Sequence, residues 1–406
     1  MPETSSLFYL GRQPIFNRDL ETVAYELLFR AGFGNRADVQ DGDQATARII
    51  EQICLESDLA AIVEDKQAFI NVTRPFILGE YPLPLKPGQV VLEVLEDITL
   101  DESLLEALKA LRKKGYRIAL DDFLWQEGVE PFIELAEFVK LDILSLSKDA
   151  LEDYVQRLKP FDVKLLAEKV ETWEQWEDCR ERGFDYFQGY FMGKPRVLSG
   201  ARLPQNRLTL LRLLSYIQRP DASVKEIEKL ISSDVALSFR LLKVVNSAFY
   251  SFPTRVESVR RAVVLLGFDA IRRWATLIVL SAYNDNPPEL LRLSLIRARM
   301  CESIAEEMGE GRIKDSYFTM GLFSLLDALL DQPMERIIAS LPLVEAINEA
   351  LLHRAGRMGM VLRWVEAYER GDIAEIAAAF DLQKMRRIWE KAVSWESAIS
   401  RELAIS

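Results

Sequence analysis

The regular alternation of short β-rich runs with amphipathic stretches constrains the first half of this chain more than any other feature. Seven apolar runs follow one another between residues 23 and 191: VAYELLFR, AFINVT, VVLEVLE, YRIALDDF, FVKLDIL, VKLLAEKVE and DYFQGYF. Helical patterns such as DESLLEALKALRKKG and SKDALEDYVQRLK separate them. Seven or eight such βα units in about 200 residues predict a closed α/β TIM-like (β/α)8 barrel, with an open doubly wound sheet as the alternative.

The pattern changes at about Leu203, where helix follows helix to the end of the chain, beginning with LPQNRLTLLRLLSYIQ. Pro195, Gly200 and Pro204 punctuate the change. We therefore predict a barrel over residues 1–195, a linker over 196–203 and an all-α domain over 204–406.

Composition narrows the function further. A single histidine, His353, excludes a two-histidine metal site, so metal chemistry would rest on carboxylates. The formal charge of −12 argues against binding of nucleic acid polymers. Three dispersed cysteines, no leader-like start and no long apolar run predict a cytoplasmic protein without a membrane span.

Polar residues stand near the end of run after run. In a barrel, the carboxyl ends of the strands share one mouth, so these residues become neighbours in space. Clustered carboxylates repel one another unless cations neutralise them, and an oxygen-rich, histidine-free set favours Mg²⁺ or Mn²⁺, plausibly as a pair of ions. The residues gathered in this way are Glu26, Asn71, Glu93, Asp121, Asp122, Lys140, Glu168, Glu171 and Gln188.

These runs resemble the motifs of the EAL domain, a barrel family that hydrolyses cyclic di-GMP in bacterial signalling. YELLFR is similar to the EAL-x-R signature, FINVT to its asparagine strand and LEVLED to its E-L-T-E. DDF, KLD, AEKVE and QGYFMGKP follow in the family's order. The literal triplet Glu106-Ala107-Leu108 has a helical period and is predicted to lie on the outer ring instead.

The resemblance implies a role for each matched residue. The implied metal ligands are Glu26, Asn71, Glu93, Asp121 and, at a second ion, Asp122. The implied catalytic residues are Glu168, Lys140 and Asp122, of which Lys140 and Glu168 would lie near the attacking water. The implied substrate-binding residues are Gln13, Arg30 and Gln188, with Glu171 supporting the site.

This sequence departs from the family pattern at three places: Leu27 replaces an alanine, Lys169 replaces a glycine, and DDFLWQEGVEPF replaces a glycine-rich loop. The Leu124-Trp125 pair in that loop is suited to packing on an apolar surface, for example that of the helical domain. We expect the barrel to bind cyclic di-GMP and divalent metal, with weak or absent hydrolysis. The alternative is a catalytically inactive sensor or scaffold.

The second half, with SSDVALSFRLLKVVNSAFY and VESVRRAVVLLGFDAIRRWATL, resembles the HDOD domain. In YFTMGLFSLLDALL, Ser324 and Leu325 stand where related hydrolases carry a His-Asp pair, so this domain is expected to bind a protein partner rather than to catalyse. Arg272, Arg273 and Trp274 are interpreted as a solvated helix face. A homodimer is an option, and an unrelated Mg²⁺-dependent barrel enzyme is a third hypothesis.

Overall fold

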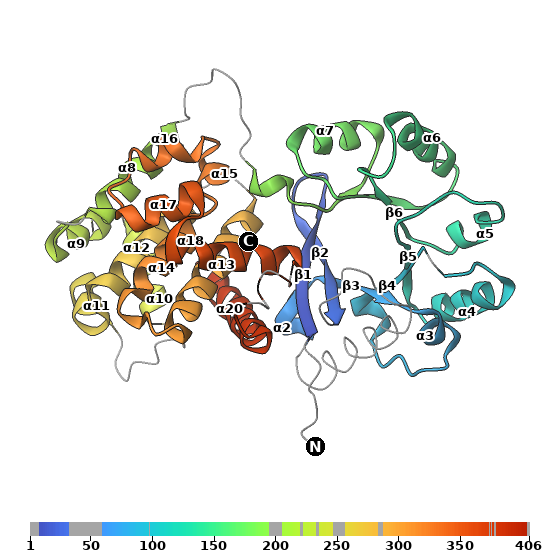
Figure 1. The fold of residues 1–406 in the computed structure, drawn as a ribbon, viewed down its shortest axis with the longest axis horizontal. Helices are drawn as coiled ribbons and strands as arrows, with labels where there is room; N and C mark the ends of the chain where they lie inside the picture. The colour runs from blue at the N-terminus through green and yellow to red at the C-terminus, as the bar shows by residue number, and fades with distance from the viewer. Residues whose placement is uncertain are drawn as a thin grey trace. The chain divides into compact units, whose positions relative to one another are not determined.

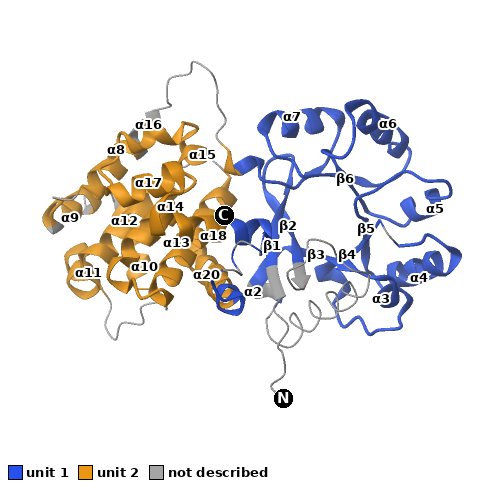
Figure 2. Ribbon diagram, viewed as in Figure 1, with its two compact units in different colours: residues 1–192, 367–386 blue, residues 193–366, 387–406 orange. Residues whose placement is uncertain are grey.

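The chain divides into two compact units, one built from Met1–Met192 and Ala367–Arg386 and the other from Gly193–Glu366 and Arg387–Ser406 (Figure 2). The computed structural model describes residues 8–31, 59–96, 98–194, 205–219, 222–232, 235–246, 256–282, 287–372, 374, 376 and 379–403, and at a few of them, Arg30 included, only the backbone. The predicted linker lies outside the described residues, and the exact domain boundaries stay a prediction.

The first unit contains a closed barrel in the order β1 to β8 (Figure 1). Its strands are β1 (Phe8–Asn17), β2 (Thr22–Ala31), β3 (Gln67–Val72), β4 (Val90–Val94), β5 (Arg117–Leu120), β6 (Phe138–Asp142), β7 (Lys164–Glu168) and β8 (Tyr186–Phe187). This confirms the predicted barrel. Strand β1, which the seven runs do not include, closes it and runs antiparallel to both β2 and β8, whereas the remaining pairs are parallel.

Helices cover the outside of the barrel: α2 (Leu59–Val63), α3 (Arg74–Leu78), α4 (Glu102–Lys113), α5 (Glu130–Ile133), α6 (Lys148–Leu158) and α7 (Trp173–Arg182), with short turns η2 (Pro87–Gln89) and η3 (Phe191–Gly193). Local capping explains several of their starts, because Asp101, Ser147 and Thr172 each accept a backbone N–H at the first turn. Glu106 lies on α4 and pairs with Lys109 at the surface, so the literal EAL triplet is outside the site, as predicted.

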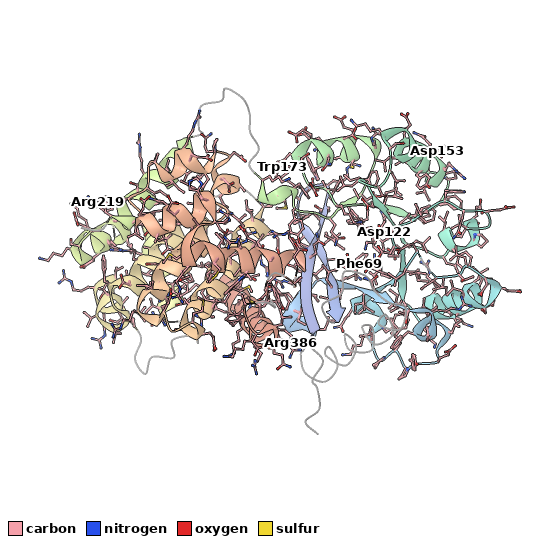
Figure 3. All side chains as sticks on the ribbon, in the orientation of Figure 1. Phe69, Asp122, Asp153, Trp173, Arg219 and Arg386 are labelled. Atoms are coloured by element: carbon pink, nitrogen blue, oxygen red, sulfur yellow. The ribbon has the colours of Figure 1, made fainter. Side chains whose placement is uncertain are left out.

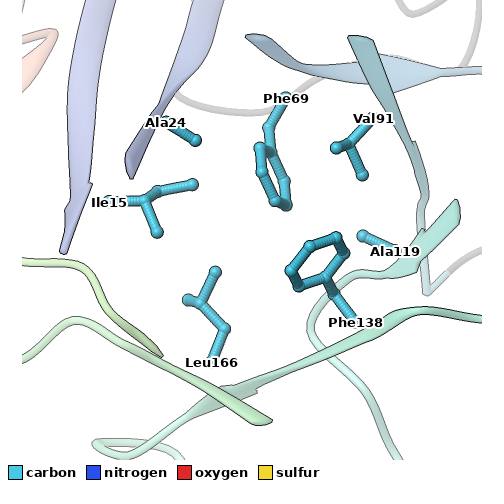
Figure 4. Close-up of a cluster of buried hydrophobic side chains, with 7 residues drawn as sticks. All are labelled: Ile15, Ala24, Phe69, Val91, Ala119, Phe138 and Leu166. Atoms are coloured by element: carbon cyan, nitrogen blue, oxygen red, sulfur yellow. The ribbon is translucent and has the colours of Figure 1, made fainter. Parts of the chain in front are cut away.

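One inward-facing side chain from each of seven strands forms the barrel core (Figure 4). The members are Ile15, Ala24, Phe69, Val91, Ala119, Phe138 and Leu166. The rings of Phe69 and Phe138 meet edge to face with centroids 5.1 Å apart. This layer plugs the barrel, so whatever lies above it is supported by a packed floor.

The second unit is helical, as predicted: α8 (Gln205–Gln218), α9 (Val224–Ser232), α10 (Val235–Val245), α11 (Val259–Leu266), α12 (Phe268–Ala282), α13 (Pro288–Glu307), η4 (Gly311–Ile313), α14 (Lys314–Phe323), α15 (Leu326–Leu330), α16 (Met334–Ile338), α17 (Glu345–His353), α18 (Gly356–Arg370) and α20 (Leu382–Leu403). The Ala367–Arg386 segment belongs to the barrel unit, where the Tyr190 hydroxyl donates to the Glu369 carbonyl over 2.8 Å. None of the helices among the described residues has the length and apolar character needed to span a bilayer.

Two expectations about the helical unit can be compared with its structure. Ser324 is buried. Its hydroxyl donates to the Gly321 carbonyl and accepts a hydrogen bond from Arg297, so its contacts are those of a structural core residue. The interpretation of Arg272, Arg273 and Trp274 as one solvated face is wrong. Trp274 is buried near Trp395, because consecutive helical residues point about 100° apart and cannot share a face.

Candidate functional site

The candidate site is the next inward-facing layer of the barrel. Side chains alternate along a strand with a period of two, so the residue two positions beyond each core residue also points inward, nearer the carboxyl end. On the parallel strands that layer comprises Glu26, Asn71, Glu93, Asp121, Lys140, Glu168 and Gln188. Strand β1 runs the other way, so its member, Gln13, precedes the core residue Ile15 by two.

The Lys140 ammonium lies at the centre of this layer and is fully buried. Its Nζ is 2.5 Å from Glu93 Oε1, 2.6 Å from Asp121 Oδ1, 2.9 Å from Glu168 Oε1 and 3.3 Å from Glu26 Oε2. One positive charge therefore faces four carboxylates in a space from which water is largely excluded.

Amide side chains hold Glu26 in this layer. Gln188 Nε2 donates to Glu26 Oε2 over 2.7 Å and to Gln13 Oε1 over 3.0 Å, and Asn71 Nδ2 donates to Glu26 Oε1 over 3.5 Å. Gly189, next to Gln188, lies so close to the backbone of Val170 that a Cβ there would be 1.9 Å from the Val170 carbonyl oxygen. Only glycine permits this close approach of the chain after β8 to the chain after β7.

Burial and the crowding of charge shift the pKa values of the layer. Burial, followed by the charge of Glu26, raises the pKa of Glu93 well above its usual range. Burial raises the pKa of Glu168 to about 8, although Lys140 opposes this. Burial would lower the pKa of Lys140, but the surrounding carboxylates outweigh it and hold that pKa well above its ordinary value.

A second ion pair flanks the layer at Asp122, which is labelled with the core residue Phe69 in Figure 3. Lys169 Nζ lies 2.5 Å from Asp142 Oδ2 and 3.8 Å from Asp122 Oδ1. Asp122 and Lys169 both have left-handed backbones, with φ of 39° and 56°. Such strain in non-glycine residues costs roughly 1 kcal/mol or more each and is concentrated at functional sites.

The donor chemistry of the layer fits a divalent cation. It is made of carboxylate and amide oxygens, the ligands that Mg²⁺ and Mn²⁺ prefer. Glu93 Oε2, Glu168 Oε2 and Gln188 Oε1 are buried without a hydrogen-bond donor among the described residues. Among the described residues, however, no group of three acidic, histidine or cysteine side chains is arranged to hold a metal ion. The carboxylates of Glu93 and Asp121 contact the Lys140 ammonium instead.

Two predicted site residues are not part of the layer as the structure describes it. Glu171 is exposed, and its backbone N–H donates to Gln175 Oε1 at the start of α7, so the residue contributes to helix capping. Arg30 is on β2, but its side chain lies outside the described residues. Sequence reasoning omitted Asp142, although the KLD run that contains it was recognised and its position at a strand end was the available signal.

The altered loop after Asp122 packs on its own unit. The Trp125 backbone N–H donates to the Tyr154 hydroxyl over 3.2 Å, and the Arg157 guanidinium lies 3.7 Å from the centroid of the indole ring. Tyr154 and Arg157 belong to α6. Trp125 therefore packs on α6 of its own unit, and Leu124 is 57% exposed, while a contact of this pair with the helical domain stays a prediction.

Comparisons with known proteins identify two domain families in this chain. The family model of the EAL domain matches residues 81–195, and that of the HDOD domain matches residues 203–330. The chain is 33% identical to the cyclic di-GMP phosphodiesterase CdgJ of Vibrio cholerae over 98% of this chain and 94% of that protein. It is 32% identical to the uncharacterized protein YuxH of Bacillus subtilis over 95% of this chain and 97% of that protein.

Solved structures similar to this chain include a cyclic di-GMP complex of the phosphodiesterase PaMucR. The identity is 22%, the match covers 50% of this chain and 99% of that chain, and the TM-score is 0.38. A manganese and cyclic di-GMP complex of BlrP1 from Klebsiella pneumoniae is 23% identical. That match covers 47% of this chain and 56% of that chain, with a TM-score of 0.37.

Proposed function

Because this chain belongs to the family of proteins in which an EAL domain precedes an HDOD domain, we propose that its barrel binds cyclic di-GMP and hydrolyses it slowly with divalent metal. The helical domain would pass the ligand state of the barrel to a protein partner. A relative of nearly equal length and the same two domains, CdgJ, is named as a cyclic di-GMP phosphodiesterase, which supports this choice of substrate.

The observation that carries the proposal is the charge imbalance around Lys140. Four carboxylates surround one ammonium in a buried layer at the carboxyl end of the barrel strands. A purely structural network would be balanced, since uncompensated buried charge is costly. The excess of negative charge, together with buried oxygens that lack hydrogen-bond donors, favours a site built to receive cations.

The residues that would hold metal are Glu26, Asn71, Glu93, Asp121 and Asp122. Divalent ions bound there would lower the pKa of the attacking water and offset charge on the phosphodiester. Lys140 stays charged and keeps Glu93, Asp121 and Glu168 together. Glu168 can hold a proton near neutral pH. Gln13, Arg30 and Gln188 would face the dinucleotide, with the Arg30 guanidinium suited to a phosphate.

The reaction is a hydrolysis in which water attacks phosphorus. One P–O bond forms and one P–O bond of the ring breaks, so the cyclic dinucleotide opens to a linear one. The leaving ribose oxygen takes up the proton that the attacking water gives up, and the other hydrogen of the water stays with the new phosphate group or is released to solvent.

Lys169 favours a second candidate, a sensor that binds the nucleotide without turnover. Its ammonium lies near Asp122, one of the implied metal ligands, and competes with a divalent ion for that carboxylate. The DDFLWQEGVEPF loop also packs Trp125 on α6 in place of a glycine-rich turn. Both features predict weaker metal uptake than a full set of ligands would support, and hence slow hydrolysis.

The test uses the purified full chain. Calorimetry would measure binding of Mn²⁺ and of cyclic di-GMP, and chromatography would measure the linear product. We expect binding of both and a turnover number well below about 1 s⁻¹, with product formation lost in Glu168→Gln and unchanged in the exposed control Glu127→Gln. A folded chain that binds neither metal nor nucleotide would contradict the proposal. Binding without any product would select the sensor instead.

A further inference from the structure

A cavity of about 260 Å³ lies within the helical unit. Its walls come from the end of α8, from α12, from η4 and α14, and from residues 342–347 at the start of α17 (labels in Figure 1). Helix α8 packs on α12, and α14 packs on α17, so the helices that form the walls are themselves anchored. The function proposed above does not involve this cavity.

One wall of the cavity is a polar stripe on α12. Asp269, Arg272, Arg273 and Thr276 follow the spacing i, i+3, i+4 and i+7, which places them on one side of the helix. Thr276 is buried, and its hydroxyl donates to the Arg272 carbonyl and accepts from Gln218 Nε2 over 3.0 Å. The inner end of this stripe is therefore rigid and its hydrogen bonds are satisfied.

The opposite wall is largely apolar, although Asp315, Ser316 and Thr319 also line it. Phe318 and Leu322 on α14 face the cavity together with Ile347 on α17. At the rim, Ile313 and Val344 are 48% and 54% exposed, an unusual exposure for such large apolar residues. A polar wall facing an apolar one, with an apolar rim, is the pattern of a small-molecule site.

The arginines of the cavity are not equally satisfied. Arg273 is paired, with its Nη1 2.7 Å from Glu302 Oε1 and 3.2 Å from Asp315 Oδ1. Within the part of the chain that the structure describes, Arg272 has no carboxylate partner. Its guanidinium lies 4.5 Å from the centroid of the Phe268 ring, and its Nε is buried without an acceptor. Arg312 likewise has no ion pair with any described residue.

The described protein groups therefore supply no acceptor for the buried Nε of Arg272, and the exposed Arg312 has no ion pair among them. A buried N–H without an acceptor costs about 1–3 kcal/mol, and a bound anion would remove that cost. Two carboxylates also line the cavity: Asp269 is exposed at the first turn of α12, and Asp315 pairs with Arg273, so Arg272 and Arg312 are the cations left to receive an anion. The volume lies below the range of about 300–1,000 Å³ that suits drug-sized ligands, so the ligand must be small.

We propose that this cavity binds a small organic anion whose phosphate or carboxylate contacts Arg272 and Arg312 while its apolar body packs on Phe318, Leu322 and Ile347. The barrel would then share the chain with a second ligand site, located in the domain that lacks a His-Asp pair. Such a site would let the helical unit respond to a metabolite as well as to the barrel.

The experiment titrates phenyl phosphate into the full chain by calorimetry, without cyclic di-GMP. Benzoate serves as the carboxylate probe, phenol as the probe without charge and inorganic phosphate as the probe without an apolar body. We expect phenyl phosphate or benzoate to bind at millimolar concentrations or below, and phenol and inorganic phosphate to bind at least about tenfold more weakly, since both walls contribute. The stronger of the two anions identifies the charged group.

Three variants locate the binding. Arg272→Met and Arg312→Met should each weaken it about tenfold, because each removes a charged hydrogen-bond donor. Ser316→Phe should block the cavity while keeping both arginines. The control is Arg261→Met, an exposed arginine on α11 outside the cavity. Arg312 is exposed, so its variant stays informative if Arg272→Met does not fold.

Two results would overturn the proposal. One is a folded chain that binds neither phenyl phosphate nor benzoate at millimolar concentrations. The other is binding that the control weakens as much as Arg312→Met or Ser316→Phe do. Neither result depends on the barrel, because every variant lies in the helical unit, so loss of cyclic di-GMP hydrolysis would leave this test unaffected.

Discussion

The two units bury charge in different ways. In the helical unit, the buried carboxylates of Glu396 and Glu302 each have an arginine partner: Glu396 Oε1 lies 2.9 Å from Arg292 Nε, and Glu302 Oε1 lies 2.7 Å from Arg273 Nη1. In the barrel, four carboxylates share the single ammonium of Lys140. A carboxylate with its own arginine is compensated, whereas the barrel layer has more acidic side chains than basic ones.

This difference separates structural charge from functional charge. Removing one partner of a balanced buried pair leaves the other uncompensated and destabilises the fold. Removing one carboxylate from an overcrowded set relieves repulsion, so it should have the opposite effect on stability. The same type of substitution, glutamate to glutamine, can therefore distinguish the two units.

Lys140→Met should have the largest effect. It leaves four buried acidic side chains without their cation, and we expect a loss of about 3–5 kcal/mol in the free energy of unfolding. Urea unfolding of the purified chain measures it, with the surface variant Lys109→Met as the control. Added Mn²⁺ should restore part of the loss. A stability equal to that of the control would mean that the acids are protonated and need no cation.

Glu396→Gln should cause the next largest loss of stability. Its carboxylate is fully buried against Arg292 and accepts from the Ser400 hydroxyl, so the variant should lose about 3 kcal/mol. Glu402→Gln is a matched control on the same helix. Glu402 is half-buried, and its ion pair with Lys243 is longer, at 3.7 Å, and more exposed to solvent. If both variants lose the same amount, burial of the Arg292 pair is not what stabilises α20.

Glu93→Gln should change stability in the opposite direction. Burial and the charge of Glu26 disfavour ionised Glu93, so a neutral amide should raise the free energy of unfolding by about 1–2 kcal/mol. The same variant should bind Mn²⁺ more weakly by calorimetry. If Glu93→Gln were destabilised, the Glu93 charge would stabilise the fold as the buried ion pairs of the helical unit do, and the comparison would fail.

Lys169→Gly should raise the affinity of the barrel for Mn²⁺. Removing an ammonium 3.8 Å from Asp122 is worth about 1 kcal/mol in a solvated setting, or roughly fivefold in Mn²⁺ affinity. Lys169→Met keeps the left-handed backbone and removes only the charge, so it should show the same gain. Unchanged affinity in both variants would remove Lys169 from the account of slow turnover.

The smallest effect is expected at the half-exposed pair of Arg117 and Glu137. The hydrogen bond from Arg117 lowers the pKa of Glu137, so the pair stabilises the fold above the ordinary glutamate pKa and stops doing so as pH falls through the lowered value. Glu137→Gln should lose less than about 1 kcal/mol near neutral pH and match the wild type in acid. Urea midpoints at the two pH values test this, and an equal difference at both would contradict it.

Much of the barrel layer could be predicted because strand ends are visible in the sequence. A polar residue that closes an apolar run, as Glu93 or Lys140 does, signals a side chain at the mouth. Strand β1 was missed, because its residues do not form an uninterrupted apolar run and it pairs antiparallel with its neighbours. Asp142 was omitted because its partner, Lys169, replaces a glycine and so had no expected role.

The sequence by itself determined the order of the elements, the change from barrel to helices and most of the residues that reach the mouth, Glu171 excepted, since these follow from local periodicity. Only the tertiary structure decided which charges meet. It set Lys140 among four acids, Trp125 on α6, and Arg272 and Arg312 beside one cavity. These contacts join residues far apart in the chain, and their geometry depends on strand register and helix packing, which no local pattern encodes.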